Sequence, residues 1–222
     1  EEEQKKMKPG ILYIATGNEH KVSEIAEMLG NSVRCLSMKS LASPPDLIED
    51  GDTFEANALA KASQLEAWLK TQSLDNKQYY VLADDSGLEV DALGGRPGVF
   101  SARFAADETA CSGNATDEAN NAKLIRLLKD VPEKERTGRF RCVLALIHSF
   151  PKATASGQWT FSGSCEGHLM LESSGDQGFG YDPLFRPMGF DQTFAELGAT
   201  IKNRISHRSH ALQKLQTFLS RT

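Results

Sequence analysis

Apolar residues recur along this chain with two spacings, one typical of helices and one typical of strands. Apolar positions three and four residues apart form a stripe along one face of a helix. The longest such stripe begins at Phe54 and predicts a helix over about 53–71. The same spacing predicts further helices at 22–29, 119–128 and 211–219.

Two of these helices follow residues that are typical of helix starts. Asp52 is followed three residues later by Glu55, which is the spacing of a capping box. Thr116 precedes Asp117 and Glu118, and acidic residues in a first turn favour the helix dipole. We therefore expect these two helices to begin directly after Asp52 and Thr116.

Short apolar runs rich in aromatic and β-branched residues predict the strands. The run at 139–147 alternates at first and then becomes continuously apolar, which is typical of a strand that enters a core. We expect it to pair in antiparallel fashion with the alternating run at 159–167. The predicted strands are 11–15, 33–37, 79–82, 139–147 and 159–167.

The composition is that of an ordinary globular protein, with 222 residues, 40% hydrophobic and 25% charged. This length suffices for one large domain or two small lobes. The net charge of −5, with dispersed Lys and Arg, argues against a nucleic acid polymer as partner. No apolar run approaches the roughly 18 residues of a membrane-spanning helix. Residues 1–9 are polar and do not resemble a signal peptide, so we expect a mobile tail there and a single domain over 10–222.

The four cysteines are Cys35, Cys111, Cys142 and Cys165. They lie far apart, and none belongs to a C-x-x-C motif or a zinc-binding spacing. Reduced thiols are therefore favoured over a disulfide pair, which is consistent with a cytoplasmic protein.

An acidic pair, Asp84 and Asp85, follows the predicted strand at 79–82, and we expect the strand to end there. Buried carboxylates are costly unless a cation, a proton or hydrogen-bond donors meet them. The exits of strands in open α/β sheets are also where ligands bind. The alternative is a solvated turn, and the pair alone does not distinguish the two.

Cations occupy two predicted helix starts, where the helix dipole disfavours them. Lys21 follows the turn Thr16-Gly17-Asn18, and a second cluster with Lys202, His207 and Arg208 precedes the last helix. A bound anion would reconcile these cations with the dipole. The alternatives are a simple turn and a solvated basic cluster.

A glycine-rich segment carries an aromatic ring between two glycines, Gly178-Phe179-Gly180. A ring that such a turn exposes can stack on a base, although a core Phe in a turn is the alternative. Glu49 lies near the start of the long helix, whose Asn57 and Lys61 share one face. Because Mg²⁺ commonly joins one or two carboxylates to substrate phosphates, the set indicates Mg²⁺-dependent chemistry on a nucleoside triphosphate.

Seven motifs in family order over about 11–219 make the chain resemble the inosine/xanthosine triphosphate pyrophosphatase family. The motifs are Ala15-Thr16-Gly17-Asn18 with Lys21; Glu49-x-Gly51-x-Thr53-Phe54 with Asn57 and Lys61; Ala83-Asp84-Asp85-Ser86-Gly87-Leu88; Gly94-Gly95-x-Pro97-Gly98 with Ser101-Ala102-Arg103; Gly178-Phe179-Gly180-Tyr181-Asp182-Pro183; Phe194-Ala195-Glu196-Leu197; and Lys202 with Ser206-His207-Arg208.

The resemblance implies an α/β fold with a mixed central β-sheet flanked by helices, in two lobes with a nucleotide-binding cleft between them. It implies a homodimer that hydrolyses ITP, dITP and XTP to the monophosphate and pyrophosphate with Mg²⁺. Carried over, Asp85 is the general base and a metal ligand, Glu49 is the other metal ligand, and Asp84 is a candidate helper. The implied substrate-binding residues are Thr16, Gly17, Asn18, Lys21 and Ser86 for the phosphates, Phe179, Gly180, Tyr181 and Asp182 for base and sugar, and Lys202, His207 and Arg208 for the base carbonyl and the phosphates.

Three other activities remain open at this point. A related pyrophosphatase for modified pyrimidine nucleotides would share the fold and the metal. A haloacid-dehalogenase-type phosphatase would need an acid where Ser86 stands. A non-catalytic nucleotide-binding regulator would bind the triphosphate without turnover.

Overall fold

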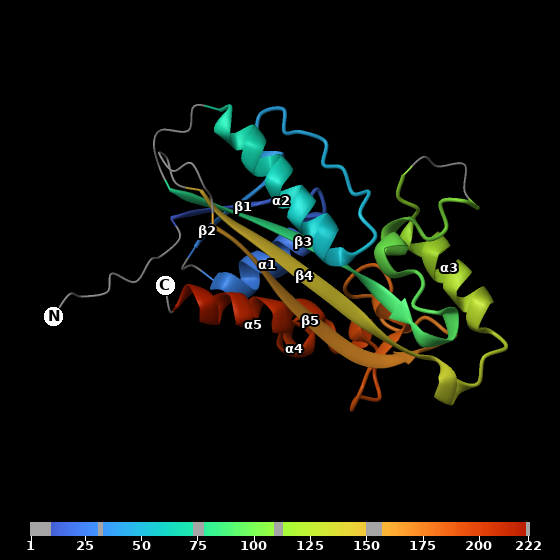
Figure 1. Cartoon of the computed structure of the whole chain (residues 1–222). Coiled ribbons are helices and arrows are strands. Elements are labelled where there is room, and N and C mark those ends of the chain that lie inside the picture. The colour runs from blue at the N-terminus through green and yellow to red at the C-terminus, as the bar shows by residue number, and fades with distance from the viewer. Residues whose placement is uncertain (1–9, 31–32, 73–77, 109–112, 150–156, 221–222) are drawn as a thin grey trace. The chain divides into compact units, whose positions relative to one another are not determined.

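The computed structural model describes residues 10–30, 33–72, 78–108, 113–149 and 157–220 (Figure 1). The predicted tail at 1–9 and Cys111 lie outside the described residues. Among the described cysteines, Cys35, Cys142 and Cys165, no disulfide bond is formed. No helix in the described ranges has the length and apolar character needed to cross a membrane.

The strands form one six-stranded sheet in the order β2-β1-β3-β4-β5-β6. β1 pairs in parallel with both β2 and β3, whereas β5 and β6 are antiparallel. The sheet is therefore mixed, as expected. The strands are β1 (Ile11–Ile14), β2 (Arg34–Ser37), β3 (Tyr79–Val90), β4 (Thr137–Ser149), β5 (Gly157–Leu169) and β6 (Phe185–Pro187).

The helices confirm the predicted apolar stripes but correct one start. Thr53, not Asp52, caps the long helix, because its side chain accepts a hydrogen bond from the Ala56 backbone N–H. Thr116 caps its helix as predicted, through the Ala119 N–H. The α-helices are α1 (Glu19–Leu29), α2 (Phe54–Lys70), α3 (Asp117–Leu128), α4 (Phe194–Ile205) and α5 (His207–Leu219).

The described chain divides into two compact units. Unit 1 comprises the described parts of 1–85, 143–162 and 210–222. Within it, α2 lies on one side of the strands, and α1 and α5 lie on the other (Figure 1). Because helices cover both faces, the central strands β1 and β3 are apolar over Ile11–Ile14 and 79–83, and Ile14, Val81 and Leu82 are fully buried. Gln216 of α5 donates to the Met28 carbonyl and ties α5 to α1.

Unit 2 comprises 86–142 and 163–209 and has its own apolar core. The core is built around three aromatic rings, with centroids of Phe140 and Phe185 4.7 Å apart and those of Phe185 and Phe194 5.2 Å apart. Leu88 and Leu184 are fully buried in the same cluster. This core supports the segments that carry the glycine-rich motif and the second basic cluster.

The central strand β3 does not end at the acidic pair, and that prediction was wrong. It runs from Tyr79 to Val90 and is buried over nearly its whole length. Its parallel partner β1 stops pairing at Ile14, opposite Leu82. Asp84 and Asp85 therefore lie just beyond the carboxyl end of the parallel ladder while remaining inside a strand. Two lysines, described below, neutralise the acids and allow them to stay there.

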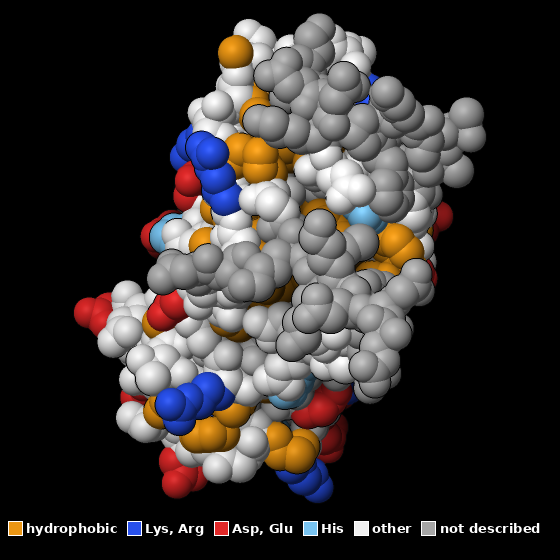
Figure 2. Space-filling model, turned by 90° about the vertical axis from the view of Figure 1, so that its left-hand side faces the viewer, with side chains coloured by type: hydrophobic (Ala, Val, Ile, Leu, Met, Phe, Trp, Pro, Cys, Tyr) orange, Lys and Arg blue, Asp and Glu red, His pale blue; other side chains and the backbone are white. Residues whose placement is uncertain are grey.

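Charged side chains are dispersed on the face that Figure 2 shows. Among the coloured residues of that view, Lys and Arg side chains stand apart from one another, and Asp and Glu side chains lie between them. This face carries no broad single-sign patch among the residues drawn in colour. That distribution agrees with the dispersed charges of the sequence.

Candidate functional site

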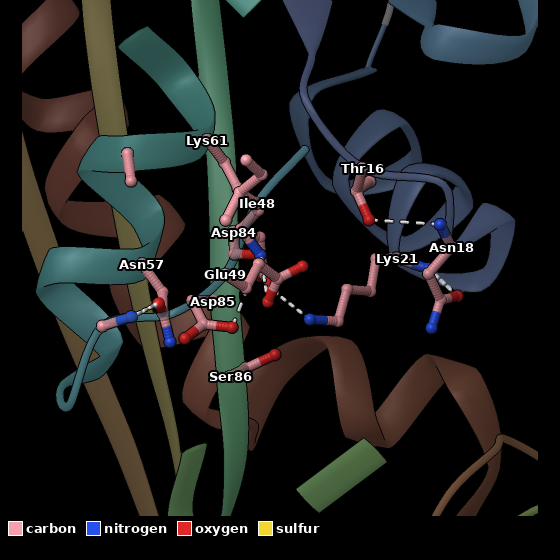
Figure 3. A network of polar contacts seen from close by, with 12 residues as sticks. Thr16, Asn18, Lys21, Ile48, Glu49, Asn57, Lys61, Asp84, Asp85 and Ser86 are labelled. Carbon is pink, nitrogen blue, oxygen red and sulfur yellow. Dashed lines mark hydrogen bonds and ion pairs between the residues drawn. The ribbon is translucent and has the colours of Figure 1, made fainter. Parts of the chain in front are cut away.

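An ion-pair network in unit 1 surrounds the two acids of β3 (Figure 3). Asp84 is fully buried, and its Oδ1 lies 2.7 Å from Lys21 Nζ. The Lys61 ammonium donates to the Asp84 backbone carbonyl at 2.9 Å. The same ammonium lies 3.4 Å from Asp85 Oδ1 and 3.2 Å from Glu49 Oε2. Lys61 thus joins the two carboxylates that the sequence predicted as metal ligands.

The environment makes Asp85 a stronger base than an exposed aspartate. Burial raises the pKa of its carboxyl, and the charges of Lys61 and Lys21 offset only part of this effect. The neighbouring Glu49 carboxylate raises the pKa further. A carboxylate whose pKa is raised is better matched to proton abstraction near neutral pH.

The donor atoms at Glu49 and Asp85 fit a divalent cation that prefers oxygen. Lys61 occupies Asp85 Oδ1, whereas Asp85 Oδ2 is buried and accepts no hydrogen bond from any residue that the structure describes. Within the described ranges, no group of three or more His, Cys, Asp or Glu side chains could hold a metal ion. Two carboxylates fit Mg²⁺, which completes its shell with water and substrate phosphates, better than a metal that needs an all-protein cage.

At the start of α1, the residues that were predicted to bind an anion already have partners within the chain. Asn18 Oδ1 accepts from the backbone N–H groups of His20 and Lys21 at 3.0 and 3.3 Å. Thr16 Oγ1 accepts from the Asn18 N–H at 3.1 Å. A Cβ at Gly17 would meet no atom within 4 Å, so the turn is open on that side. An anion bound at this turn would therefore replace Asn18 Oδ1 as the acceptor of the two backbone N–H groups, and it would replace Asp84 as the partner of the Lys21 ammonium.

In unit 2, the glycine-rich motif encloses a buried ion pair. Lys202 Nζ lies 2.7 Å from Asp182 Oδ2, and their side chains are only 4% and 2% exposed. The ammonium also lies 4.6 Å from the centroid of the Phe179 ring. The Phe179 N–H donates to the same carboxylate oxygen at 2.9 Å. Gly178 has φ +80°, and a Cβ there would collide with Asp182, so only glycine fits.

Lys202 does not stand at the start of the last helix, as the sequence had suggested. It lies in the final turn of α4, where the helix dipole favours a cation. The start of α4 is a capping box formed by Thr193 and Glu196. Of the three cationic residues predicted at the start of the last helix, His207 and Arg208 do lie in the first turn of α5.

The remaining predicted residues of unit 2 have defined partners as well. The Tyr181 hydroxyl donates to the Ser101 carbonyl at 2.8 Å, and burial raises the pKa of that hydroxyl. Arg208 is almost fully buried and donates from Nη2 to Ser86 Oγ at 2.9 Å. The His207 ring stacks on Phe140, with centroids 4.9 Å apart.

The structure therefore places the predicted residues in two groups, each held together by contacts within one unit. Unit 1 gathers Thr16, Gly17, Asn18, Lys21, Glu49 and Asp85, and unit 2 holds Ser86, Phe179, Gly180, Tyr181, Asp182, Lys202, His207 and Arg208.

Sequence reasoning left the role of Lys61 open and did not find Gln64, Asp117 or Asn121. Asp117 accepts from the Gly180 N–H at 2.7 Å, and Asn121 donates to the Gly180 carbonyl at 3.0 Å. Their spacing of four residues along α3 was a usable signal for a shared face. The hydrogen bonds of Gln64 with the described residues all go to backbone atoms, and no sequence motif reveals such contacts.

Two carboxylates beside lysines on an α/β sheet fit an enzyme that uses Mg²⁺ to bind a phosphorylated ligand, because Mg²⁺ joins one or two carboxylates to substrate phosphates. The model of the Ham1 family matches residues 12–218, and the chain belongs to that family. This membership confirms the resemblance that the sequence motifs indicated.

Two relatives illustrate the match. A protein of Desulforamulus reducens, named dITP/XTP pyrophosphatase, is 47% identical over 212 residues, covering 95% of this chain and 96% of that protein. A protein of Opitutus terrae with the same name is 42% identical over 211 residues, covering 92% and 96%.

Solved structures agree with the fold. A HAM1 protein from Coxiella burnetii superposes with a TM-score of 0.77 at 35% identity, covering 96% of this chain and 100% of that one. The Ham1 protein of Staphylococcus aureus gives a TM-score of 0.73 at 36% identity, covering 94% and 97%. These likenesses confirm the predicted α/β fold class.

Proposed function

We propose that this chain hydrolyses non-standard purine nucleoside triphosphates, namely ITP, dITP and XTP, to the monophosphate and pyrophosphate with Mg²⁺. Relatives named dITP/XTP pyrophosphatase match it over nearly its whole length, which supports this activity. The observation that carries the proposal is the carboxylate of Asp85. One of its oxygens is held by Lys61. The other is buried with no donor in good hydrogen-bond geometry among the described residues, although the nearby Asn57 side chain lowers the pKa of the carboxyl.

In this proposal Asp85 is the general base, and Glu49 and Asp85 hold Mg²⁺. Bound Mg²⁺ supplies neutralisation of phosphate charge and so lowers the barrier to attack at phosphorus. The Asp85 carboxylate accepts the proton of the attacking water, and Lys61 at Oδ1 fixes the orientation of that carboxylate. Thr16, Gly17, Asn18, Lys21 and Ser86 bind the phosphates.

The residues of unit 2 are proposed to recognise the nucleoside. Phe179, Gly180, Tyr181 and Asp182 contact base and sugar, and Lys202, His207 and Arg208 reach the base carbonyl and the phosphates. The base acceptor at position 6 would receive hydrogen bonds from these cationic donors. A 6-amino group would leave buried donors unpaired, and sites of this kind discriminate by about 10⁴-fold or more.

We place this activity in the cytoplasm, and we propose that the protein acts as a homodimer. Both statements come from the family resemblance, and the described cysteines, which form no disulfide, are consistent with a reducing compartment. Light scattering coupled to gel filtration tests the dimer, since a monomer mass at micromolar concentration would contradict it.

One assay tests the central proposal. The purified chain is incubated with Mg²⁺ and a panel of dITP, XTP, ITP, GTP, ATP and modified pyrimidine triphosphates, and the products are identified by chromatography. We expect monophosphate and pyrophosphate from the first three. Release of orthophosphate, or a preference for the pyrimidine nucleotides, would reject the proposal, and binding without turnover would indicate a regulator instead.

A further inference from the structure

One face of α2 carries three polar side chains that hold the segment around Glu49. Asn57, Lys61 and Gln64 lie at positions i, i+4 and i+7 of the helix, so they form a single stripe. Lys61 meets the Glu49 carboxylate itself at 3.2 Å. Asn57 and Gln64 form hydrogen bonds with the backbone on either side of Glu49. Figure 3 shows Asn57, Lys61 and Glu49.

Gln64 binds both backbone polar groups of the residue before Glu49. The Ile48 N–H donates to Gln64 Oε1 at 2.9 Å, and Gln64 Nε2 donates to the Ile48 carbonyl at 3.0 Å. The side-chain amide therefore pairs with Ile48 as a neighbouring strand would. Gln64 Nε2 also donates to the Ala60 carbonyl at 3.1 Å, which anchors the amide to its own helix.

Asn57 holds the backbone on the other side of Glu49. Its Oδ1 accepts from the Gly51 N–H at 2.8 Å. A Cβ at Gly51 would lie 2.8 Å from this oxygen and 3.0 Å from the Ala56 Cβ. The close approach of the segment to α2 therefore requires glycine at this position.

Apolar packing holds this segment only in part, because Pro44, Pro45 and Leu47 are half-buried and the residues on both sides of Glu49 are exposed. Residues 44–51 form neither helix nor strand, and the Ile48 side chain is 62% exposed. The neighbouring Asp46 and Asp50 are exposed as well. The position of Glu49 therefore depends on polar contacts such as those from α2.

We propose that Gln64 and Asn57 are positioning residues that fix Glu49 for divalent-cation binding with Asp85. This inference rests on the proposed function for the identity of the cation and the reaction. Residues that orient metal ligands typically change metal affinity or activity by about 10- to 100-fold when they are replaced. Because Glu49 is only one of two carboxylates, we expect an effect near the lower end of that range.

The test replaces Gln64 by Met, which preserves length and removes both hydrogen bonds to Ile48. The matched control is Gln216→Met, which removes a glutamine hydrogen bond to a backbone carbonyl in the same unit, between α5 and α1. Mn²⁺ binding to the nucleotide-free protein is measured by electron paramagnetic resonance. The Mg²⁺ dependence of turnover is measured at saturating dITP.

We expect Gln64→Met to weaken Mn²⁺ binding about 10-fold and to raise the half-saturating Mg²⁺ concentration by a similar factor. The kcat at saturating Mg²⁺ should stay near the wild-type value, and the control should change neither quantity. Unchanged Mn²⁺ affinity in Gln64→Met, or no Mn²⁺ binding by the wild type, would overturn the inference. A wild type that binds Mn²⁺ but leaves dITP intact would reject the proposed function and not the positioning role.

Discussion

Replacing Lys202 by Met should strongly destabilise the protein, because it leaves the buried Asp182 carboxylate without this counter-charge. The two charges lie 2.7 Å apart with almost no exposure. At an effective dielectric constant of about 20, their attraction is on the order of 6 kcal/mol. Desolvation offsets part of this attraction, and deleting one partner of a buried pair typically costs about 3–5 kcal/mol. We therefore expect a loss of about 4 kcal/mol in the free energy of unfolding.

A second substitution distinguishes the stability lost to the unpaired charge from the stability lost to poorer packing. Asp182→Asn in the Lys202→Met background removes the charge and keeps an oxygen that can accept from the Phe179 N–H. About half of the lost stability should return. The control is Arg126→Met, since Arg126 and Glu108 are also 2.7 Å apart but are 54% and 39% exposed. That exposed pair should contribute less than about 1 kcal/mol.

Urea unfolding followed by far-UV circular dichroism measures these differences. Tryptophan fluorescence is unsuitable, because Trp68 and Trp159 both belong to unit 1 and Lys202 belongs to unit 2. A Lys202→Met protein within about 1 kcal/mol of the wild type, or a double variant less stable than the single one, would refute the reasoning.

Three further predictions concern single residues of the two groups. Asp85→Asn should abolish turnover and retain triphosphate binding. It should also raise the thermal unfolding temperature at pH 7, and that gain should shrink as the pH falls through the raised pKa of Asp85 and vanish only near the pKa of an ordinary aspartate. Normal kcat, or a lower unfolding temperature at pH 7, would contradict that assignment. Lys21→Ala should weaken binding of triphosphate more than of monophosphate in calorimetric titrations, and an equal loss for both would place Lys21 away from the phosphate tail. Gly178→Ala should cost about 1–3 kcal/mol in urea unfolding, because φ is +80° and the added methyl group meets Asp182, and a neutral effect would show that the turn can rearrange.

The element pattern was predictable wherever apolar spacing decided the structure. The stripes of α2 and α3 and the apolar runs of β1 and β4 were located to within a few residues, because burial on one or two faces imposes a period on the sequence. The class of reaction was also indicated, since carboxylates and lysines recur in family order. The capping residues were predicted less accurately. Thr53 rather than Asp52 caps α2, and the sequence did not distinguish the two because both residue types can accept the capping hydrogen bond.

The wrong predictions concern residues whose interaction partners lie far away in the sequence. Asp84 and Asp85 were taken as the end of a strand, but Lys21 and Lys61, remote in sequence, neutralise them and let β3 continue. Lys202 was taken as a mismatch with a helix dipole, although it ends α4 and pairs with Asp182. Contacts to backbone atoms, such as those of Gln64, leave no trace in residue type or spacing.

The pairing of Lys21 with Asp84, and of Lys61 with Glu49 and Asp85, means that unit 1 carries its own counterions. A magnesium–nucleotide complex arriving there meets two lysines and three carboxylates that are already paired with one another. When it binds, the lysines leave their carboxylates for the phosphates, and the carboxylates leave the lysines for the metal ion. The number of unpaired charges therefore changes little. Affinity in such a site depends on how well the new geometry replaces the old one, and it responds only weakly to added salt.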